Sequence, residues 1–255
     1  MKILKFLFVA LIVLGSVIGA YFYGRHSVLS SDEEVLRQAN LNILKEFMLK
    51  FNARGGAYIL IDRDTGETVD TSFINMDENF ALTPHNINKL FLYAAGLKNG
   101  EITAENVSFE KDKEAYKTIT DEAKKPVYEA LNLTDTLTPR QLLTAYTSLL
   151  NNKNNLLTSE QLDILRAALL NNVQNGISRK AQVEGVQVSG ISSTDHKENA
   201  QRTNVFLADF ALNGKNYAII TVLDEPKPLK ITYGFNSAGW NAVPMTQFLI
   251  RNMIK

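Results

Sequence analysis

The stretch GGAYILIDRDTGE, residues 55–67, decides the fold of this chain. Its two glycines are followed by a short apolar run, Ala57 to Ile61, which is typical of a buried β-strand. Asp62 to Gly66 is polar and ends on glycine, as tight turns do, and a second strand is expected after it. The stretch therefore predicts a strand, a turn and a strand at the start of a sheet.

Helical patterns lie on both sides of this unit. Upstream, serines stand before carboxylates at residues 30–34, a pattern typical of a helix start. Apolar residues then recur at helical spacing up to Phe51, which predicts a helix there. Downstream, Pro84 and Pro139 mark helix starts, and Gly100 marks a helix end. The expected downstream helices cover residues 84–97, 121–131, 138–150, 159–170 and 241–254.

Three further strands are expected at residues 186–192, 203–212 and 216–223. Asn213-Gly214 separates the last two and is a strong hairpin signal. The order of two strands, several helices, three strands and a final helix predicts an α+β domain, in which an antiparallel sheet is flanked by helices.

The N-terminus carries an uncharged, mostly apolar run at residues 6–24. At 1.5 Å per residue a helix of this length spans about 28 Å, close to the thickness of a bilayer core. Lys2 and Lys5 precede the run, which favours an N-terminus inside the cell and a chain outside the cytoplasmic membrane. A signal peptide cleaved after Ala20 is the alternative interpretation.

The expected organisation is a single-pass protein of the cytoplasmic (inner) membrane with a periplasmic or extracytoplasmic domain. Its parts are a cytoplasmic tip at 1–5, a transmembrane helix at 6–24, a juxtamembrane helix at 25–54 and a domain at 55–255.

Composition excludes several classes of function. The chain has 255 residues, 45% of them apolar, and a formal net charge of zero, which suits one globular domain plus an appendage. Basic residues do not cluster among aromatic ones, so no nucleic-acid partner is expected. The absence of cysteine excludes disulfides and thiolate chemistry. His26, His85 and His196 lack the spacing of metal ligands, so neither a metal nor a cofactor is expected.

Six stretches carry a family resemblance, among them TPRQLLTAY before residue 147 and DEPK at 224–227. In order they are residues 55–67, 83–89, 137–146, 176–190, 206–227 and 237–244. Together they resemble the transpeptidase domain of class B penicillin-binding proteins, most closely the septal cell-division transpeptidases. The resemblance implies a penicillin-binding protein/β-lactamase-like transpeptidase fold. The short segment between Ile102 and Thr136 predicts that the helical lobe of that fold is reduced.

The resemblance also implies a chemistry whose residues are missing here. The family acylates an activated serine with a D-Ala-D-Ala stem peptide or a β-lactam, using a nearby lysine, a Ser-x-Asn loop and a Lys-Thr-Gly strand. Asn86 stands at the serine position, and Lys89 remains three residues on, either paired with a carboxylate or solvated. No Ser-x-Asn occurs. The strand position reads Ile191-Ser192-Ser193-Thr194, which keeps only the threonine.

A substitute nucleophile would have to come from another serine. Ser108 begins the only Ser-x-x-Lys, a pattern that a chain of this composition contains about once by chance. Ser192 and Ser193 lie on the strand that faces the cleft of the family. Asp195 and His196 are near in sequence, but on a strand His196 points away from Ser193 and Asp195, so a triad there is awkward.

These observations predict a membrane-anchored, catalytically inactive relative that acts as an interaction or regulatory pseudoenzyme in peptidoglycan synthesis or cell division. No catalytic residue is assigned; the degenerate active-site positions are Asn86, Lys89, Ser192, Ser193 and Thr194. The expected partners are cell-envelope or divisome proteins. The alternatives are an active serine acyltransferase or D,D-carboxypeptidase with a non-standard nucleophile, and a non-catalytic binder of stem peptides by strand addition.

Overall fold

The computed structural model describes residues 33–110, 114–196, 202–228 and 237–254. The chain divides into two compact units, residues 1–41 and 42–255. Among the described residues no helix is both long and apolar enough to cross a membrane. The anchor predicted at residues 6–24 lies outside the described ranges, so the anchor and the domain limits drawn around it stay predictions.

The centre of the larger unit is a five-stranded sheet with the order β2-β1-β5-β4-β3. Every neighbouring pair is antiparallel, as the sequence predicted. Asn213 and Gly214 both have positive φ, 52° and 75°, as the tight turn between β4 and β5 requires. The strands are β1 (Gly55–Asp62), β2 (Thr68–Ile74), β3 (Val188–His196), β4 (Arg202–Leu212) and β5 (Lys215–Asp224).

The strand expected at 186–192 is shifted, because β3 begins at Val188 and continues to His196. Its second half pairs with β4 down to the partners His196 and Arg202. This half carries serine, threonine and aspartate instead of an apolar alternation. Strand pairing and side-chain hydrogen bonds hold it, which a search for apolar periodicity does not detect.

Helices form where the caps predicted them. Thr138 and Thr158 each accept a hydrogen bond from a backbone N–H of the first turn, in complete capping boxes with Gln141 and Gln161. Gly100 ends α2 in the left-handed conformation. The helices are residues 33–50, α2 (Asn88–Asn99), α3 (Asp121–Leu131), α4 (Pro139–Leu150), α5 (Ser159–Gln174) and α6 (Ala242–Ile254). Short 3₁₀ turns are η1 (His85–Ile87), η2 (Ala104–Asn106), η3 (Ala115–Thr118), η4 (Arg179–Ala181) and η7 (Ala238–Trp240).

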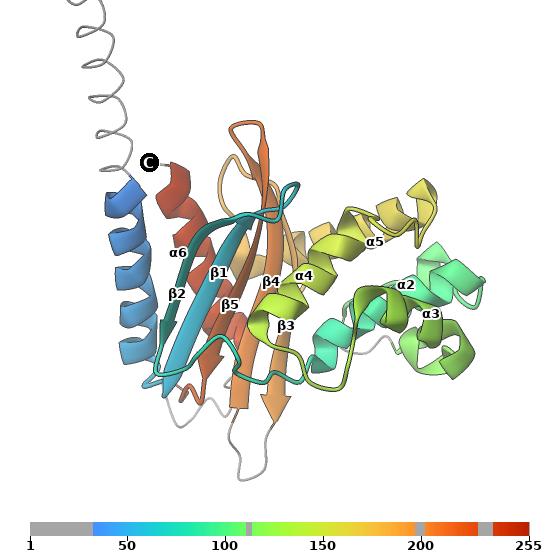
Figure 1. The fold of residues 1–255 in the computed structure, drawn as a ribbon, viewed down its shortest axis with the longest axis horizontal. Helices are drawn as coiled ribbons and strands as arrows, with labels where there is room; N and C mark the ends of the chain where they lie inside the picture. Colours follow the sequence, from blue (N-terminus) through green and yellow to red (C-terminus); the bar gives the residue numbers. More distant parts are fainter. Residues whose placement is uncertain (1–32, 111–113, 197–201, 229–236, 255) are drawn as a thin grey trace, which may run out of the picture. The chain divides into compact units, whose positions relative to one another are not determined.

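The two faces of the sheet bury two separate apolar cores. Side chains of α2, α3, α4 and α5 cover one face, and α6 covers the other (Figure 1). Leu44, Phe47 and Met48 join the second core, so this part of the helix at 33–50 packs on the sheet of its own chain. Gly56 permits that approach, since a Cβ there would lie 2.9 Å from Leu44 Cδ1. The antiparallel sheet flanked by helices is confirmed.

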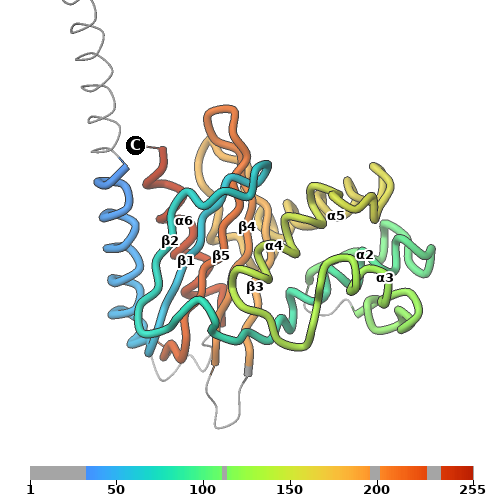
Figure 2. The backbone as a smooth tube through the Cα atoms, in the orientation of Figure 1, coloured from blue at the N-terminus to red at the C-terminus, as the bar shows by residue number. Residues whose placement is uncertain are grey.

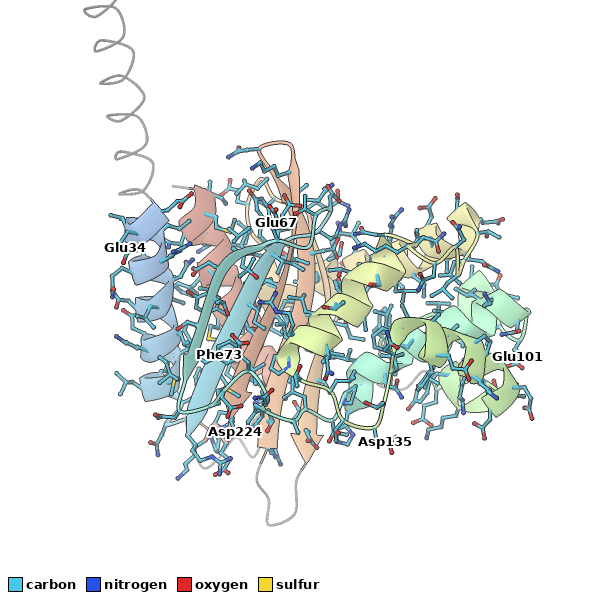
Figure 3. All side chains as sticks on the ribbon, in the orientation of Figure 1. Glu34, Glu67, Phe73, Glu101, Asp135 and Asp224 are labelled. Atoms are coloured by element: carbon cyan, nitrogen blue, oxygen red, sulfur yellow. The ribbon has the colours of Figure 1, made fainter. Side chains whose placement is uncertain are left out.

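Two connections place the parts that form the site. Between β2 and α4 the chain runs through η1 into α2, which packs against α3 (Figure 2). Asp224, which is labelled in Figure 3, is the last residue of β5. Its carboxylate accepts hydrogen bonds from Arg54 Nε and Thr203 Oγ1, both at 2.8 Å. The second contact ties the start of β4 to the end of β5, and β3, the neighbour of β4 in the sheet, lies against η1.

Candidate functional site

The candidate site is a cleft of about 680 Å³ between η1 with the start of α2, the strand β3 and the turn η7. The five degenerate positions all line it, which places residues from two distant parts of the sequence on one surface. They are Asn86, Lys89, Ser192, Ser193 and Thr194.

Asn86 is the second residue of η1, which begins directly after Pro84, and its backbone N–H donates to Ser193 Oγ at 3.1 Å. In serine acyltransferases the backbone N–H of the nucleophile helps to stabilise the oxyanion of the tetrahedral intermediate. Here this N–H is already satisfied by the side chain of Ser193, which stands where the family has a glycine. A glycine at position 193 would have no side chain to accept this hydrogen bond, so the N–H of residue 86 would be open to a ligand.

Lys89 follows in α2 and is buried, with 9% of its surface exposed. Its ammonium lies 4.8 Å from the centre of the Tyr116 ring, a cation–π contact. It forms no ion pair with any carboxylate in the part of the chain that the structure describes. The pairing with a carboxylate that was one alternative is not found there, and the solvated alternative stays a prediction. Burial lowers the pKa of Lys89, and Glu114 opposes this shift in part.

The hydroxyls of β3 are engaged by the protein itself. Asn172 Nδ2 donates to Ser178 Oγ at 3.1 Å, and Ser178 Oγ donates to Ser192 Oγ at 3.2 Å. Thr194 Oγ1 accepts the backbone N–H of Ala238 at 2.9 Å. Together with the bond from Asn86 to Ser193, these contacts give each hydroxyl of β3 at the cleft a structural partner.

Ile191 is buried at 2% exposure and lines the same cleft. It occupies the strand position at which the family resemblance calls for a carboxylate-binding lysine. The wall that would receive a substrate carboxylate is therefore apolar.

His85 is the residue at the cleft that sequence reasoning missed. Its Nε2 lies 2.5 Å from Asp195 Oδ1, although 110 positions separate the two residues. His85 has a φ of 38°, in the left-handed region that non-glycine residues rarely adopt. From the sequence, Asp195 was considered as a partner only for its neighbour His196, whose side chain lies outside the part of the chain that the structure describes. The signal in the sequence that could have pointed to His85 as a residue of the cleft was its position next to Asn86.

Ser108 stands apart from these residues. Its carbonyl accepts the Tyr93 hydroxyl at 2.8 Å, and its Oγ accepts the N–H of Glu110. Lys111, the other end of its Ser-x-x-Lys pattern, lies outside the described residues. Within those residues no group of His, Asp and Glu side chains could hold a metal ion.

Sequence comparison gives a limited match. No protein-family model matches the chain. A probable peptidoglycan D,D-transpeptidase, FtsI of Caulobacter vibrioides, is 30% identical over 99 residues. This match covers 34% of the present chain and 17% of the length of FtsI.

Structural similarity extends over most of the chain. The transpeptidase domain of the FtsI4 D,D-transpeptidase of Legionella pneumophila superposes with a TM-score of 0.72 at 17% identity, over 86% of this chain and 96% of that domain. The corresponding domain of Burkholderia pseudomallei penicillin-binding protein 3 gives 0.70 at 16% identity, over 87% and 94%. Mycobacterium tuberculosis penicillin-binding protein 3 with aztreonam gives 0.68 at 12%, over 86% and 76%. The chain thus has the transpeptidase-domain fold of class B penicillin-binding proteins, as its sequence motifs predicted.

Proposed function

We propose that this chain is a membrane-anchored, non-catalytic relative of the class B transpeptidases that acts by interaction in peptidoglycan synthesis or cell division. The fold and the partial similarity to FtsI support the cellular process. One observation carries the lack of catalysis: Asn86 occupies the nucleophile position, with its N–H bonded to Ser193.

Three separate losses at the cleft support the lack of catalysis. A carboxamide at Asn86 has no hydroxyl to attack a carbonyl, and removing a serine nucleophile reduces turnover about a million-fold. The backbone N–H that would stabilise the oxyanion is occupied. The wall at Ile191 offers no cation to a substrate carboxylate. Because each loss alone slows acyl transfer, their combination leaves binding as the function.

The direct test is labelling of the full chain with a fluorescent penicillin, read by gel and by intact mass. We expect no covalent adduct from a preparation that unfolds cooperatively. A transpeptidase with an intact site, labelled in parallel, controls for the reagent. A stoichiometric adduct would overturn the proposal, and peptide mapping would identify the nucleophile.

Restoring the serine alone should not restore labelling. In Asn86→Ser the new hydroxyl lies three residues before Lys89, but the N–H of residue 86 stays bonded to Ser193 and Ile191 still provides no cation. We expect labelling of Asn86→Ser at the level of the unmodified chain, measured by the same gel and mass assay. Rapid labelling of this single variant would show that one substitution accounts for the whole loss of activity.

A second candidate is an active serine acyltransferase, and the pair of His85 and Asp195 favours it. Ser193 lies two positions from Asp195 on β3 and completes a serine, histidine and aspartate set at the cleft. Against it, the hydrogen bond recorded for Ser193 joins its Oγ to Asn86 N rather than to His85. If penicillin labels the chain and Ser193→Ala abolishes the label, this second function replaces the first.

The interaction proposal places the domain on the outer face of the cytoplasmic membrane, held by the predicted anchor at residues 6–24. Its partners would be cell-envelope or divisome proteins. Affinity purification of the tagged full chain from solubilised membranes tests this, with a copy carrying an unrelated transmembrane segment as control. Recovery of no envelope protein would contradict the proposal.

A further inference from the structure

Among the described residues, the ammonium of Lys89 has a cation–π partner and no ion pair, and it lies on the wall of the cleft. The side chain is 9% exposed, lines the cleft and contacts the Tyr116 ring at 4.8 Å. An ammonium carries three donors, and an aromatic face satisfies the charge without accepting from all of them. A carboxylate that enters the cleft can accept from this ammonium in a charge-assisted hydrogen bond, which is stronger than a bond between neutral groups.

The other charges at the cleft are already engaged. His85 is bonded to Asp195, and Glu114 to Lys117 Nζ at 2.7 Å. Arg202 also lines the cleft and has interactions of its own. Lys89 is therefore the charged group at this surface that is open to a ligand, among those that the structure describes.

Apolar side chains share the lining of the cleft with polar ones. Phe109 and Ile191 are buried at 5% and 2% exposure, and Ile177 is exposed at 48%. Tyr116 lies under the ammonium. A ligand that reaches Lys89 thus removes apolar surface from water along its length, which favours an apolar body next to its charged group.

We propose that Lys89 makes the cleft a binding site for a small monocarboxylate with an apolar body. The carboxylate pairs with the Lys89 ammonium, and the apolar body lies against Ile177, Ile191 and Phe109. The inference rests on the proposed function, since a lysine committed to proton transfer with a nucleophile would not be open to a ligand. It differs from the arrangement implied by the family resemblance, in which the strand lysine, here Ile191, binds the carboxylate.

The apolar part of the lining favours a monoanion over a phosphate or a dicarboxylate, because apolar walls disfavour a strongly hydrated dianion. The charges near the ammonium oppose one another, since Glu114 raises the pKa of Lys89 and Lys117 lowers it. A single carboxylate at hydrogen-bond distance would reverse the downward shift that burial imposes on the pKa of Lys89.

The experiment compares 3-phenylpropanoate with its neutral amide, 3-phenylpropanamide, by calorimetric titration of the full chain at pH 7 and low salt. We expect the acid to bind about tenfold or more tightly than the amide, since a charge-assisted bond to a buried cation is made only by the acid. Equal affinities for the two compounds would overturn the proposal.

Two variants test whether Lys89 causes the preference for the acid over the amide. Lys89→Met removes the charge with similar length and should bring the ratio of the two affinities close to one. Lys125→Met removes an exposed lysine of α3, whose side chain is 74% exposed, and should leave the ratio unchanged. If Lys89→Met does not fold, NMR titration of the lysine Cε resonances in the unmodified chain decides: the pKa of Lys89 should rise when the acid binds and stay constant with the amide.

This outcome is separable from that of the penicillin test. A chain that forms no penicillin adduct and shows no preference for the acid loses only the present inference. A covalent adduct overturns the lack of catalysis, whichever compound binds more tightly.

Discussion

Replacing Asp209 by alanine is expected to lower the free energy of unfolding by about 3–5 kcal/mol, because it leaves a partly buried charge and a buried hydroxyl without their partner. Asp209 Oδ2 accepts from Arg63 Nη1 at 2.9 Å, and Oδ1 accepts from the Tyr146 hydroxyl at 2.6 Å. The side chain of Arg63 is 17% exposed, and Tyr146 is fully buried. Urea unfolding of the full chain, followed by circular dichroism, measures the loss.

Two variants separate the contributions of charge and hydroxyl. Tyr146→Phe removes one neutral donor and should cost about 1–2 kcal/mol, clearly less than Asp209→Ala. Asp209→Asn keeps the shape of the side chain and should lie between them. A loss below about 1 kcal/mol for Asp209→Ala would contradict the structural role of this cluster.

The same cluster gives a pH dependence whose sign follows from burial. Burial raises the pKa of Asp209 above its usual 3.8, although Tyr146 and Arg63 oppose the shift. Since the folded pKa exceeds the unfolded one, folding favours the protonated carboxyl. Its contribution to stability is complete below pH 3.8 and is lost as the pH rises through the folded value. In Asp209→Asn this component of the stability profile should be absent.

The cluster explains why the framework of this chain could be predicted although the motif residues that the family resemblance implies for catalysis are absent. Arg63, Tyr146 and Asp209 belong to three separate stretches of the family resemblance, residues 55–67, 137–146 and 206–227. The structure brings them together at the sheet, away from the cleft lined by Asn86. They hold elements together whether or not the site reacts. Local patterns and motifs therefore predicted the α+β fold and most strand and helix limits.

The contacts at the cleft could not be predicted from local patterns. The bond between His85 and Asp195 spans 110 positions, and that between Asn86 and Ser193 spans 107. Lys89 contacts the ring of Tyr116 in η3, and no apolar periodicity in the sequence predicts this short turn. Periodicity and caps report the local conformation of a segment. The contacts between polar side chains depend on how distant segments pack against one another. Local patterns in a single sequence do not predict that packing.

Gly190→Val is expected to destabilise the domain by about 3 kcal/mol or more, because β3 and β4 leave no space for a side chain at this position. Gly190 pairs with Ala208, and a Cβ there would lie 2.5 Å from the Leu207 carbonyl oxygen and 2.7 Å from Phe206 Cζ. The carbonyl oxygen belongs to the backbone of the paired strand, so only a shift of the strand could relieve the contact. Urea unfolding measures the effect, and Gly190→Ala should give an intermediate loss.

Ser189→Val is the matched control, since it places the same side chain on the neighbouring position of β3, on the opposite and partly exposed face. It should change the stability by no more than about 0.5 kcal/mol. Gly190 also connects packing to the cleft, because its carbonyl accepts from Asn172 Nδ2, which in turn donates to Ser178 beside Ser192. If Gly190→Val proved as stable as the control, β3 would not be fixed by this close approach. The positions assigned to Ile191, Ser192 and Ser193 at the cleft would then lose their structural basis.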